Sequence, residues 1–169
     1  MGKKRLTESQ SKEILRAAGI PVTRGTLCPT EEEAMKVAGE IGYPVVAKLE
    51  SPDILHRTDA QAIQLNIQTP EELGRSFRKV VDNGRKYNPS AEILGVSVSE
   101  VIPPGREVII GVGRDSEFGP YLMFGLGGIF VEVLKDVSFR AIPILSLDAE
   151  AMIREVKGWE ILKSVITAG

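Results

Sequence analysis

The sequence predicts an α+β fold built from two lobes, and two observations carry this prediction. In the first ninety residues, segments with a 3.6-residue hydrophobic period alternate with short β-branched runs, a pattern typical of an α+β unit. After Asn88-Pro89 the pattern changes to short β-rich runs separated by Gly, Pro or Asp, which indicates antiparallel strands. We therefore expect one lobe over residues 1–89 and a second over residues 90–169.

The first predicted helix follows Thr7-Glu8-Ser9-Gln10, which has the spacing of a capping box. Ile14, Leu15 and Ala18 recur on one face of this helix, and Gly19 ends it. The segment therefore predicts an amphipathic helix at the start of the first lobe.

A short strand is predicted over residues 22–28, followed by a helix that Thr30 caps and Gly42 terminates. The apolar run over 44–48 and the run over 63–67 predict the next two strands. A loop that contains Pro52 separates them, because proline disfavours helix both at its own position and at the residue before it.

A third helix is predicted from the Thr69 N-cap to about Lys86, with a proline and two acidic residues in its first turn. The second lobe begins after it, and its final helix is predicted from Ser146 through Val156. Between these helices we expect a meander of strands over 94–102, 107–113, 121–124, 129–133 and 137–142.

The composition excludes several function classes. The net charge is −2, so no global basic field favours nucleic acid. The longest apolar stretch, 121–134, is too short and too interrupted to span a bilayer, and Lys3-Lys4-Arg5 has no apolar segment behind it. Cys28 is the only cysteine, which excludes a disulfide framework or a zinc set and favours a structural thiol. We expect a cytoplasmic protein.

The loop over residues 51–59 contains His56, the only histidine of the chain, between Asp53 and Asp59. A neutral imidazole is nucleophilic near pH 7, and an acidic neighbour on one ring nitrogen leaves the other nitrogen free to attack. Lys48 ends the preceding strand, so the segment indicates phosphate chemistry. A plain surface histidine would fit the same pattern, and so would a plain surface lysine.

Glu100 and Glu107 flank the turn between two predicted strands, which we expect to be adjacent. Two carboxylates placed in this way accept hydrogen bonds from an adenine amino group and from ribose hydroxyls. Solvated charges on an edge strand are the alternative interpretation.

Gly125-Leu126-Gly127-Gly128 lies between two apolar runs and allows the close backbone approach that a phosphate-binding loop needs. A simple hairpin would use the same glycines. Glu132, Lys135 and Asp136 follow as candidate pocket residues or as a polar strand face. Three arginines are candidates for binding anions, namely Arg106, Arg114 and Arg140.

The runs over 42–48, 51–56, 103–111 and 118–137 resemble the ATP-grasp part of the NDP-forming acyl-CoA synthetases, which are related to the succinyl-CoA synthetase β subunit. The resemblance extends from about Thr7 onward. It implies an ATP-grasp fold with nucleotide between two α+β lobes. It also implies the reaction acyl-CoA + ADP + phosphate ⇌ acid + ATP + CoA by way of phosphohistidine, with ATP/ADP and Mg²⁺ as cofactors.

The resemblance also implies roles for individual residues. Nucleotide binding falls to Lys48, Glu100, Val101, Glu107, Gly127 and Gly128. In this assignment Lys48 holds phosphate, Glu100 and the backbone of Val101 meet adenine, and Glu107 meets ribose. The two glycines flank the phosphates. His56 matches the catalytic histidine that relays phosphate between a partner's phosphohistidine and the nucleotide.

The resemblance further implies a hetero-oligomer with a CoA-binding α-type subunit or domain, which brings the acyl-CoA. Two departures from the family pattern are present. Gln61 and Ala62 stand where the family usually has two glycines, and the family's magnesium-binding segment would lie beyond Gly169. We therefore expect no metal ligand here, an incomplete C-terminal lobe and an inactive isolated chain. The alternative is a non-catalytic nucleotide-binding or regulatory fragment, including that of a fused protein acyltransferase.

Overall fold

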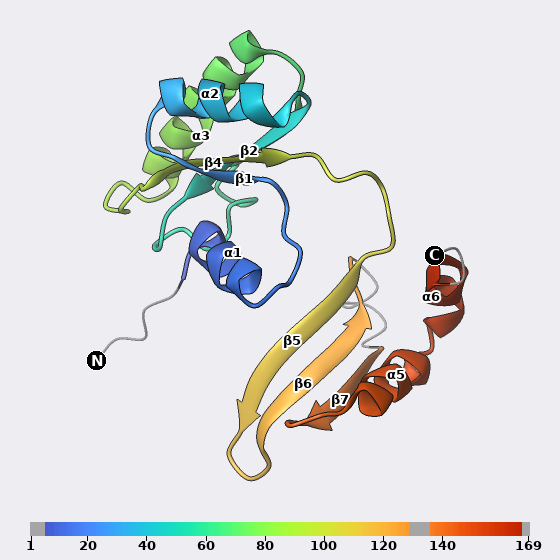
Figure 1. Cartoon of the computed structure of the whole chain (residues 1–169). Helices are drawn as coiled ribbons and strands as arrows, with labels where there is room; N and C mark the ends of the chain where they lie inside the picture. Colours follow the sequence, from blue (N-terminus) through green and yellow to red (C-terminus); the bar gives the residue numbers. More distant parts are fainter. Residues whose placement is uncertain (1–5, 129–135, 167–169) are drawn as a thin grey trace. The chain divides into compact units, whose positions relative to one another are not determined.

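The computed structural model describes residues 6–128 and 136–166, with side chains up to residue 163 (Figure 1). Contacts divide the chain into two units, Met1–Pro103 and Pro104–Gly169. The predicted mixture of helices and strands is confirmed in both units. The predicted boundary at residue 89 differs from this division, because the strand that follows Asn88-Pro89 pairs within the first unit.

The first unit is a four-stranded antiparallel sheet with helices on both faces. Its elements are α1 (Glu8–Ala17), β1 (Gly25–Cys28), α2 (Glu31–Ile41), β2 (Val45–Glu50), β3 (Ile63–Ile67), α3 (Pro70–Tyr87) and β4 (Gly95–Glu100). The strand order is β1-β4-β2-β3. Figure 1 shows α2 and α3 on one face of this sheet and α1 on the other.

Local capping explains where the three helices begin. The side chains of Thr7, Thr30 and Thr69 each accept a hydrogen bond from the backbone amide three residues later. In α1 the Gln10 side chain also accepts a hydrogen bond from the Thr7 backbone amide, so the predicted capping box is confirmed.

The hydrophobic core of the first unit lies between the sheet and the helices α2 and α3. Val45, Ala47 and Leu49 of β2 are fully buried in it. Helix α3 approaches β2 closely at Gly84, where a Cβ atom would lie 2.2 Å from Leu49 Cδ2. Side chains alternate along a strand, so Lys48 projects from the opposite face, the face on which α1 lies.

The second unit is a three-stranded antiparallel sheet covered by two helices. Its elements are β5 (Val108–Asp115), β6 (Gly119–Leu126), β7 (Val137–Ala141), α5 (Ser146–Glu155) and α6 (Trp159–Ile166). The strand order β5-β6-β7 confirms the predicted meander for these three strands. Their core is formed by Phe124, Leu126, Met152, Val156 and Leu162.

Three expectations need correction or fall outside the structure. The expectation that the strands of Glu100 and Glu107 are adjacent is wrong, because β4 pairs with β1 and β2 whereas β5 pairs with β6. Helix α6 was not predicted at all, since the sequence interpretation ended the last helix at Val156. The predicted strand over 129–133, with Glu132 and the nearby Lys135, lies outside the described residues.

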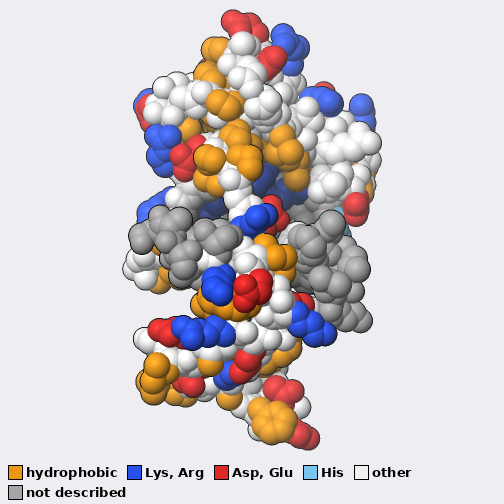
Figure 2. Space-filling view, turned by 90° about the vertical axis from the view of Figure 1, so that its right-hand side faces the viewer, with side chains coloured by type: hydrophobic (Ala, Val, Ile, Leu, Met, Phe, Trp, Pro, Cys, Tyr) orange, Lys and Arg blue, Asp and Glu red, His pale blue; other side chains and the backbone are white. Residues whose placement is uncertain are grey.

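On the face that Figure 2 shows, acidic and basic side chains are interspersed with apolar ones, so no patch of one sign of charge covers this face. Among the described residues, no helix combines the length and the hydropathy that crossing a membrane requires.

Candidate functional site

The second unit contains a cavity of about 270 Å³. It is lined by Gly105, Arg106, Glu107, Leu126, Gly127, Gly128 and Ile161. The structure thus brings together Glu107, Gly127 and Gly128, three of the six predicted nucleotide-binding residues. Of the three candidate arginines, only Arg106 lines this cavity; Arg140 instead pairs with Glu155, with Nη1 lying 2.9 Å from Oε2.

The pairing of β5 with β6 builds this cavity. Val108 pairs with Leu126, so the next residues outward, Glu107 and Gly127, meet at the end of the ladder. The Gly127 amide donates a 2.7 Å hydrogen bond to the Glu107 carbonyl oxygen. A Cβ atom at Gly127 would lie 2.7 Å from Glu107 Cβ, so glycine is required here. The close contact that this glycine allows in the structure is with Glu107, and the predicted approach to phosphate stays a prediction.

Three cavity residues were missed by the sequence interpretation, namely Gly105, Leu126 and Ile161. Leu126 had been read only as part of the glycine loop. Ile161 belongs to α6, and the start of α6 depends on a residue distant in sequence, Asp136. Its two carboxylate oxygens accept hydrogen bonds from the backbone amides of Lys157 and Gly158, each at 2.8 Å. Asp136 was a candidate pocket residue, and the structure gives it this role in holding α6.

In the first unit, Lys48 lies in a cluster of charged side chains on the α1 face of the sheet. Lys48 Nζ lies 3.2 and 3.4 Å from the two carboxylate oxygens of Glu8. Glu8 also pairs with Lys12 Nζ at 3.0 Å and with Arg57 Nη1 at 3.0 Å. Sequence reasoning did not find this cluster, and its one local signal is the four-residue spacing of Glu8 and Lys12.

Burial and charge act in opposite directions on Glu8. Burial raises the pKa of the Glu8 carboxyl, but the hydrogen bond from Lys12 and the charges of Lys48, Lys12 and Arg57 outweigh it and lower the pKa from 4.5 to about 2. Glu8 is therefore an anion at every pH at which the protein is expected to work.

Glu100 is bound to Arg24 and forms no hydrogen bond or ion pair with Lys48 or Glu8. Its carboxylate oxygens accept hydrogen bonds from Arg24 N at 2.7 Å and Arg24 Nε at 2.8 Å. These bonds lower the pKa of Glu100. In the β2–β4 ladder Glu100 pairs with Val45, whose side chain lies on the core face. Glu100 and Lys48 thus project from opposite faces of the sheet. Val101, which follows β4, is exposed.

His56 lies exposed in the loop between β2 and β3. Backbone bonds order this loop, from the Ala60 amide to the His56 carbonyl oxygen at 3.1 Å and from the Ala62 amide to the Arg57 carbonyl oxygen at 2.8 Å. Asp53, expected near the imidazole, instead accepts a 2.8 Å hydrogen bond from the Glu92 amide. Among the described residues, none forms a hydrogen bond or ion pair with the His56 ring.

The two positions that depart from the family pattern differ in conformation. Gln61 has a φ of 50°, in the left-handed region that favours glycine. Ala62 is fully buried in the core, and its φ is not positive. Only at position 61, therefore, is the backbone strained in a way that a glycine would relieve.

Two further features limit the chemistry of the described residues. Burial, with a smaller contribution from the charge of Glu33, raises the pKa of the Cys28 thiol to about 11, which agrees with a structural role. No group of three or more His, Cys, Asp or Glu side chains that could hold a metal ion is present in the part of the chain that the structure describes.

Comparison with known proteins gives consistent results. The profile of the ATP-grasp domain matches residues 1–168. The β subunit of acetate–CoA ligase (ADP-forming) II from Pyrococcus furiosus is 53% identical over 161 residues, which are 95% of this chain and 68% of that subunit.

Solved structures give the same picture. Acetyl-coenzyme A synthetase 1 from Ca. Korarchaeum cryptofilum, in complex with coenzyme A, Ca-AMPCP and HgCl+, is 46% identical with a TM-score of 0.91, covering 95% of this chain and 70% of that chain. In another structure of that synthetase, with coenzyme A and Mg-AMPPCP, a phosphohistidine segment points towards the nucleotide binding site. That structure is 42% identical with a TM-score of 0.81, covering 96% of this chain and 68% of that chain.

Proposed function

Because the chain belongs to the ATP-grasp family, we propose that it is the ATP-grasp component of an ADP-forming acyl-CoA synthetase. The complete enzyme would catalyse acyl-CoA + ADP + phosphate ⇌ acid + ATP + CoA. The similarity to the Pyrococcus furiosus β subunit supports the reaction class. That relative is one subunit of a ligase, which implies a partner subunit, and we propose a CoA-binding α-type subunit in this role.

The observation that carries the proposal is the cavity lined by Arg106, Glu107, Gly127 and Gly128. A carboxylate that borders a cavity accepts hydrogen bonds from vicinal ribose hydroxyls, and a guanidinium pairs with phosphate oxygens. The volume of about 270 Å³ lies just below the usual range for ligand pockets. The cavity therefore suits one part of a nucleotide, its sugar or a phosphate group.

We propose that His56 relays the phosphoryl group. A ring nitrogen of His56 attacks the phosphorus of the partner's phosphohistidine, a new P–N bond forms, and the P–N bond to the partner breaks. A β-phosphate oxygen of ADP then attacks, ATP forms, and His56 is released. The exposure of His56 supports this role, because a phosphohistidine of a partner can reach the ring. The reaction itself depends mainly on positioning and on charge neutralisation.

The nucleotide is proposed to arrive as a magnesium complex, as the Mg-AMPPCP complex of the Korarchaeum synthetase supports. A divalent cation supplies charge neutralisation at the phosphates. The described side chains contain no cluster that would hold it, so we assign it to none of them. Since ADP and acyl-CoA are cytoplasmic metabolites, we place the protein in the cytoplasm.

Calorimetry with ADP tests the proposal. Lys48→Met and Glu107→Ala should each weaken binding by about 1.5–3 kcal/mol, or roughly 10- to 150-fold, because each removes a charge-assisted contact. Lys36→Met and Glu117→Ala are matched controls, since both positions are exposed in the same respective units. Affinities of the first pair equal to those of the parent chain would overturn the assignment.

A further inference from the structure

The Glu8 cluster contains more positive charge than its one carboxylate can neutralise. Lys12, Lys48 and Arg57 all lie within 3.2 Å of a Glu8 oxygen. Their side chains are between 21% and 28% exposed, so water reaches the group but does not fully solvate it. Three cations pair with this one monovalent anion, and the neighbouring buried carboxylate of Glu50 is bonded to Ser9 and forms no ion pair among the described residues. A phosphate group, with up to two charges and three terminal oxygens, matches this arrangement better than a carboxylate.

Arg57 gives an independent sign of an unfilled acceptor position. Its Nη1 atom is buried and has no hydrogen bond, although Glu8 Oε2 lies 3.0 Å away, because the geometry of a hydrogen bond is not met. Buried guanidinium donors are normally satisfied. Arg57 is also the residue that follows His56, the proposed phosphoryl carrier.

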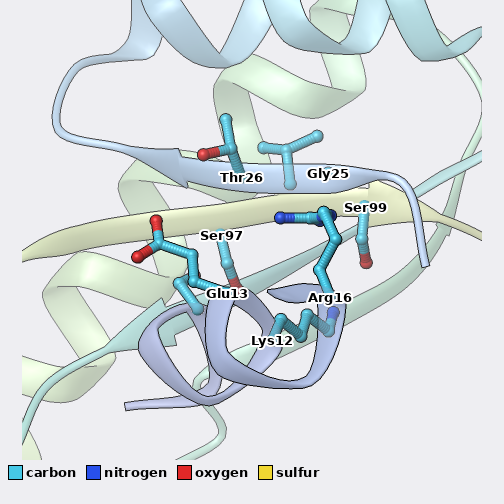
Figure 3. A pocket seen from close by; sticks show the side chains of 9 residues that line it. Lys12, Glu13, Arg16, Gly25, Thr26, Ser97 and Ser99 are labelled. Carbon is cyan, nitrogen blue, oxygen red and sulfur yellow. The ribbon is translucent and has the colours of Figure 1, made fainter. Parts of the chain in front are cut away.

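Helix α1, which carries Glu8, forms polar contacts with the sheet and buries none of its apolar side chains fully. Ser9 donates hydrogen bonds from N and Oγ to Glu50 Oε1, at 3.2 and 2.9 Å. Figure 3 shows Lys12, Glu13 and Arg16 of α1 beside Ser97 and Ser99 of β4, around a narrow crevice. No residue of α1 is buried. A helix without a buried apolar face leaves its place at a small cost, because little hydrophobic contact is lost.

We propose that the Glu8 carboxylate is a built-in competitor for a phosphate group on Lys48 and Arg57, and that phosphate binding releases α1 from the sheet. This inference rests on the proposed function in assigning phosphate to Lys48, and it adds Arg57 to that site, with Glu8 as the anion that the phosphate displaces. The incoming phosphate replaces Glu8 as the anion of the cluster. Glu8 then returns to water, and α1 loses its ion pairs with Lys48 of β2 and Arg57 of the His56 loop, so that the Ser9 bonds to Glu50 remain as the hold on its first turn.

Inorganic pyrophosphate is the probe for the test, with calorimetry on the whole chain. Glu8→Gln removes the competing charge and keeps the side-chain shape, so pyrophosphate should bind about tenfold more tightly or better than to the parent chain. Glu13→Gln is the matched control on the same helix, because Glu13 is exposed and forms no ion pair with another described residue. It should bind pyrophosphate as the parent does.

A gain of affinity cannot come from damage to the fold, so the expected result separates competition from a structural role. Equal or weaker binding by Glu8→Gln would overturn the inference. Should that variant fail to fold, Ser9→Ala carries the test, since it loosens α1 from Glu50 and leaves Lys48 and Arg57 in place. Its pyrophosphate affinity should then rise above that of the parent, and an unchanged or lower affinity would again overturn the inference.

Amide hydrogen exchange supplies the second readout. Pyrophosphate should increase exchange in α1 and leave exchange in α3 unchanged; added protection of α1 would contradict release. The proposed function is overturned by a different result, namely equal binding of ADP by the parent chain and by Lys48→Met. The competition by Glu8 is judged on pyrophosphate alone, whatever the ADP result.

Discussion

At the scale of single residues, Gln61 and Ala62 are neighbours with opposite requirements. A non-glycine residue in the left-handed region costs about 1–2 kcal/mol, which a glycine would avoid. Glycine also gives the unfolded chain more freedom, and this lowers the free energy of unfolding by about 0.4–1 kcal/mol. Gln61→Gly should therefore stabilise the protein by about 0.5–1 kcal/mol. Ala62→Gly, at a fully buried position without positive φ, should destabilise it by about 1 kcal/mol. Urea unfolding measures both, and equal effects at the two positions would contradict this interpretation.

Glu8 should make stability depend on pH in the acidic range. Its folded-state pKa of about 2 lies below the ordinary 4.5, so its contribution is complete above about pH 4.5 and is lost as the pH falls towards 2. The full difference corresponds to about 3 kcal/mol. Solvent screening at a side chain that is 25% exposed reduces this to about 1–2 kcal/mol.

Comparison of the parent chain with Glu8→Gln by denaturant unfolding between pH 7 and pH 2 measures this contribution. The parent should be more stable by about 1–2 kcal/mol at pH 7, and the difference should shrink below pH 4.5. A difference that stays constant over the range would show that charge on Glu8 is not its source.

At the scale of elements, α1 and α3 are both amphipathic in sequence, but only α3 buries its apolar face. Ile14 of α1 is 58% exposed, whereas Leu73 of α3 is 0% exposed. Ile14→Ala should therefore cost less than about 0.5 kcal/mol, and Leu73→Ala about 2–5 kcal/mol. Urea unfolding of the two variants is the measurement. A large loss in Ile14→Ala would mean that α1 is packed more firmly than its exposure indicates.

The elements also show how far sequence reasoning reaches. Helix starts were predictable because each N-cap threonine bonds an amide only three residues away. The place of β4 in the first sheet was not predictable, because its partners β1 and β2 are distant in sequence. The start of α6 was missed for the same reason, since it depends on Asp136 at a separation of 21 residues.

In the candidate site, too, contacts between residues close in sequence were predictable and distant ones were not. Glu107, Gly127 and Gly128 meet because two consecutive strands form a hairpin, which the pattern of the sequence predicts. The ion pair of Lys48 with Glu8 spans 40 residues, and no local pattern indicates it. The sequence therefore predicts the local approach of Glu107 to the two glycines, and it does not predict the distant ion pair of Lys48.

At the scale of the whole molecule, the proposed phosphoryl transfer requires a partner, and it predicts a covalent mark on this chain. Incubation with a phosphorylated CoA-binding partner should place an acid-labile, base-stable phosphate on His56. The label should be absent from His56→Ala, which removes an exposed side chain without hydrogen bonds to other described residues and so spares the fold. Label that persists in this variant would move the relay to another residue, and no label in either protein would favour the non-catalytic alternative.

The contact of α3 with β2 at Gly84 limits how this chain can mutate. All four glycine codons begin with GG, and every amino-acid replacement reached from them by one base change adds at least a Cβ atom. At position 84 that atom would meet Leu49 Cδ2 at 2.2 Å, and Leu49 directly follows Lys48. A mutation at Gly84 would therefore displace the Leu49 side chain of β2, the strand that also carries Lys48. Lineages that keep the lysine in place should retain Gly84 or change Leu49 with it.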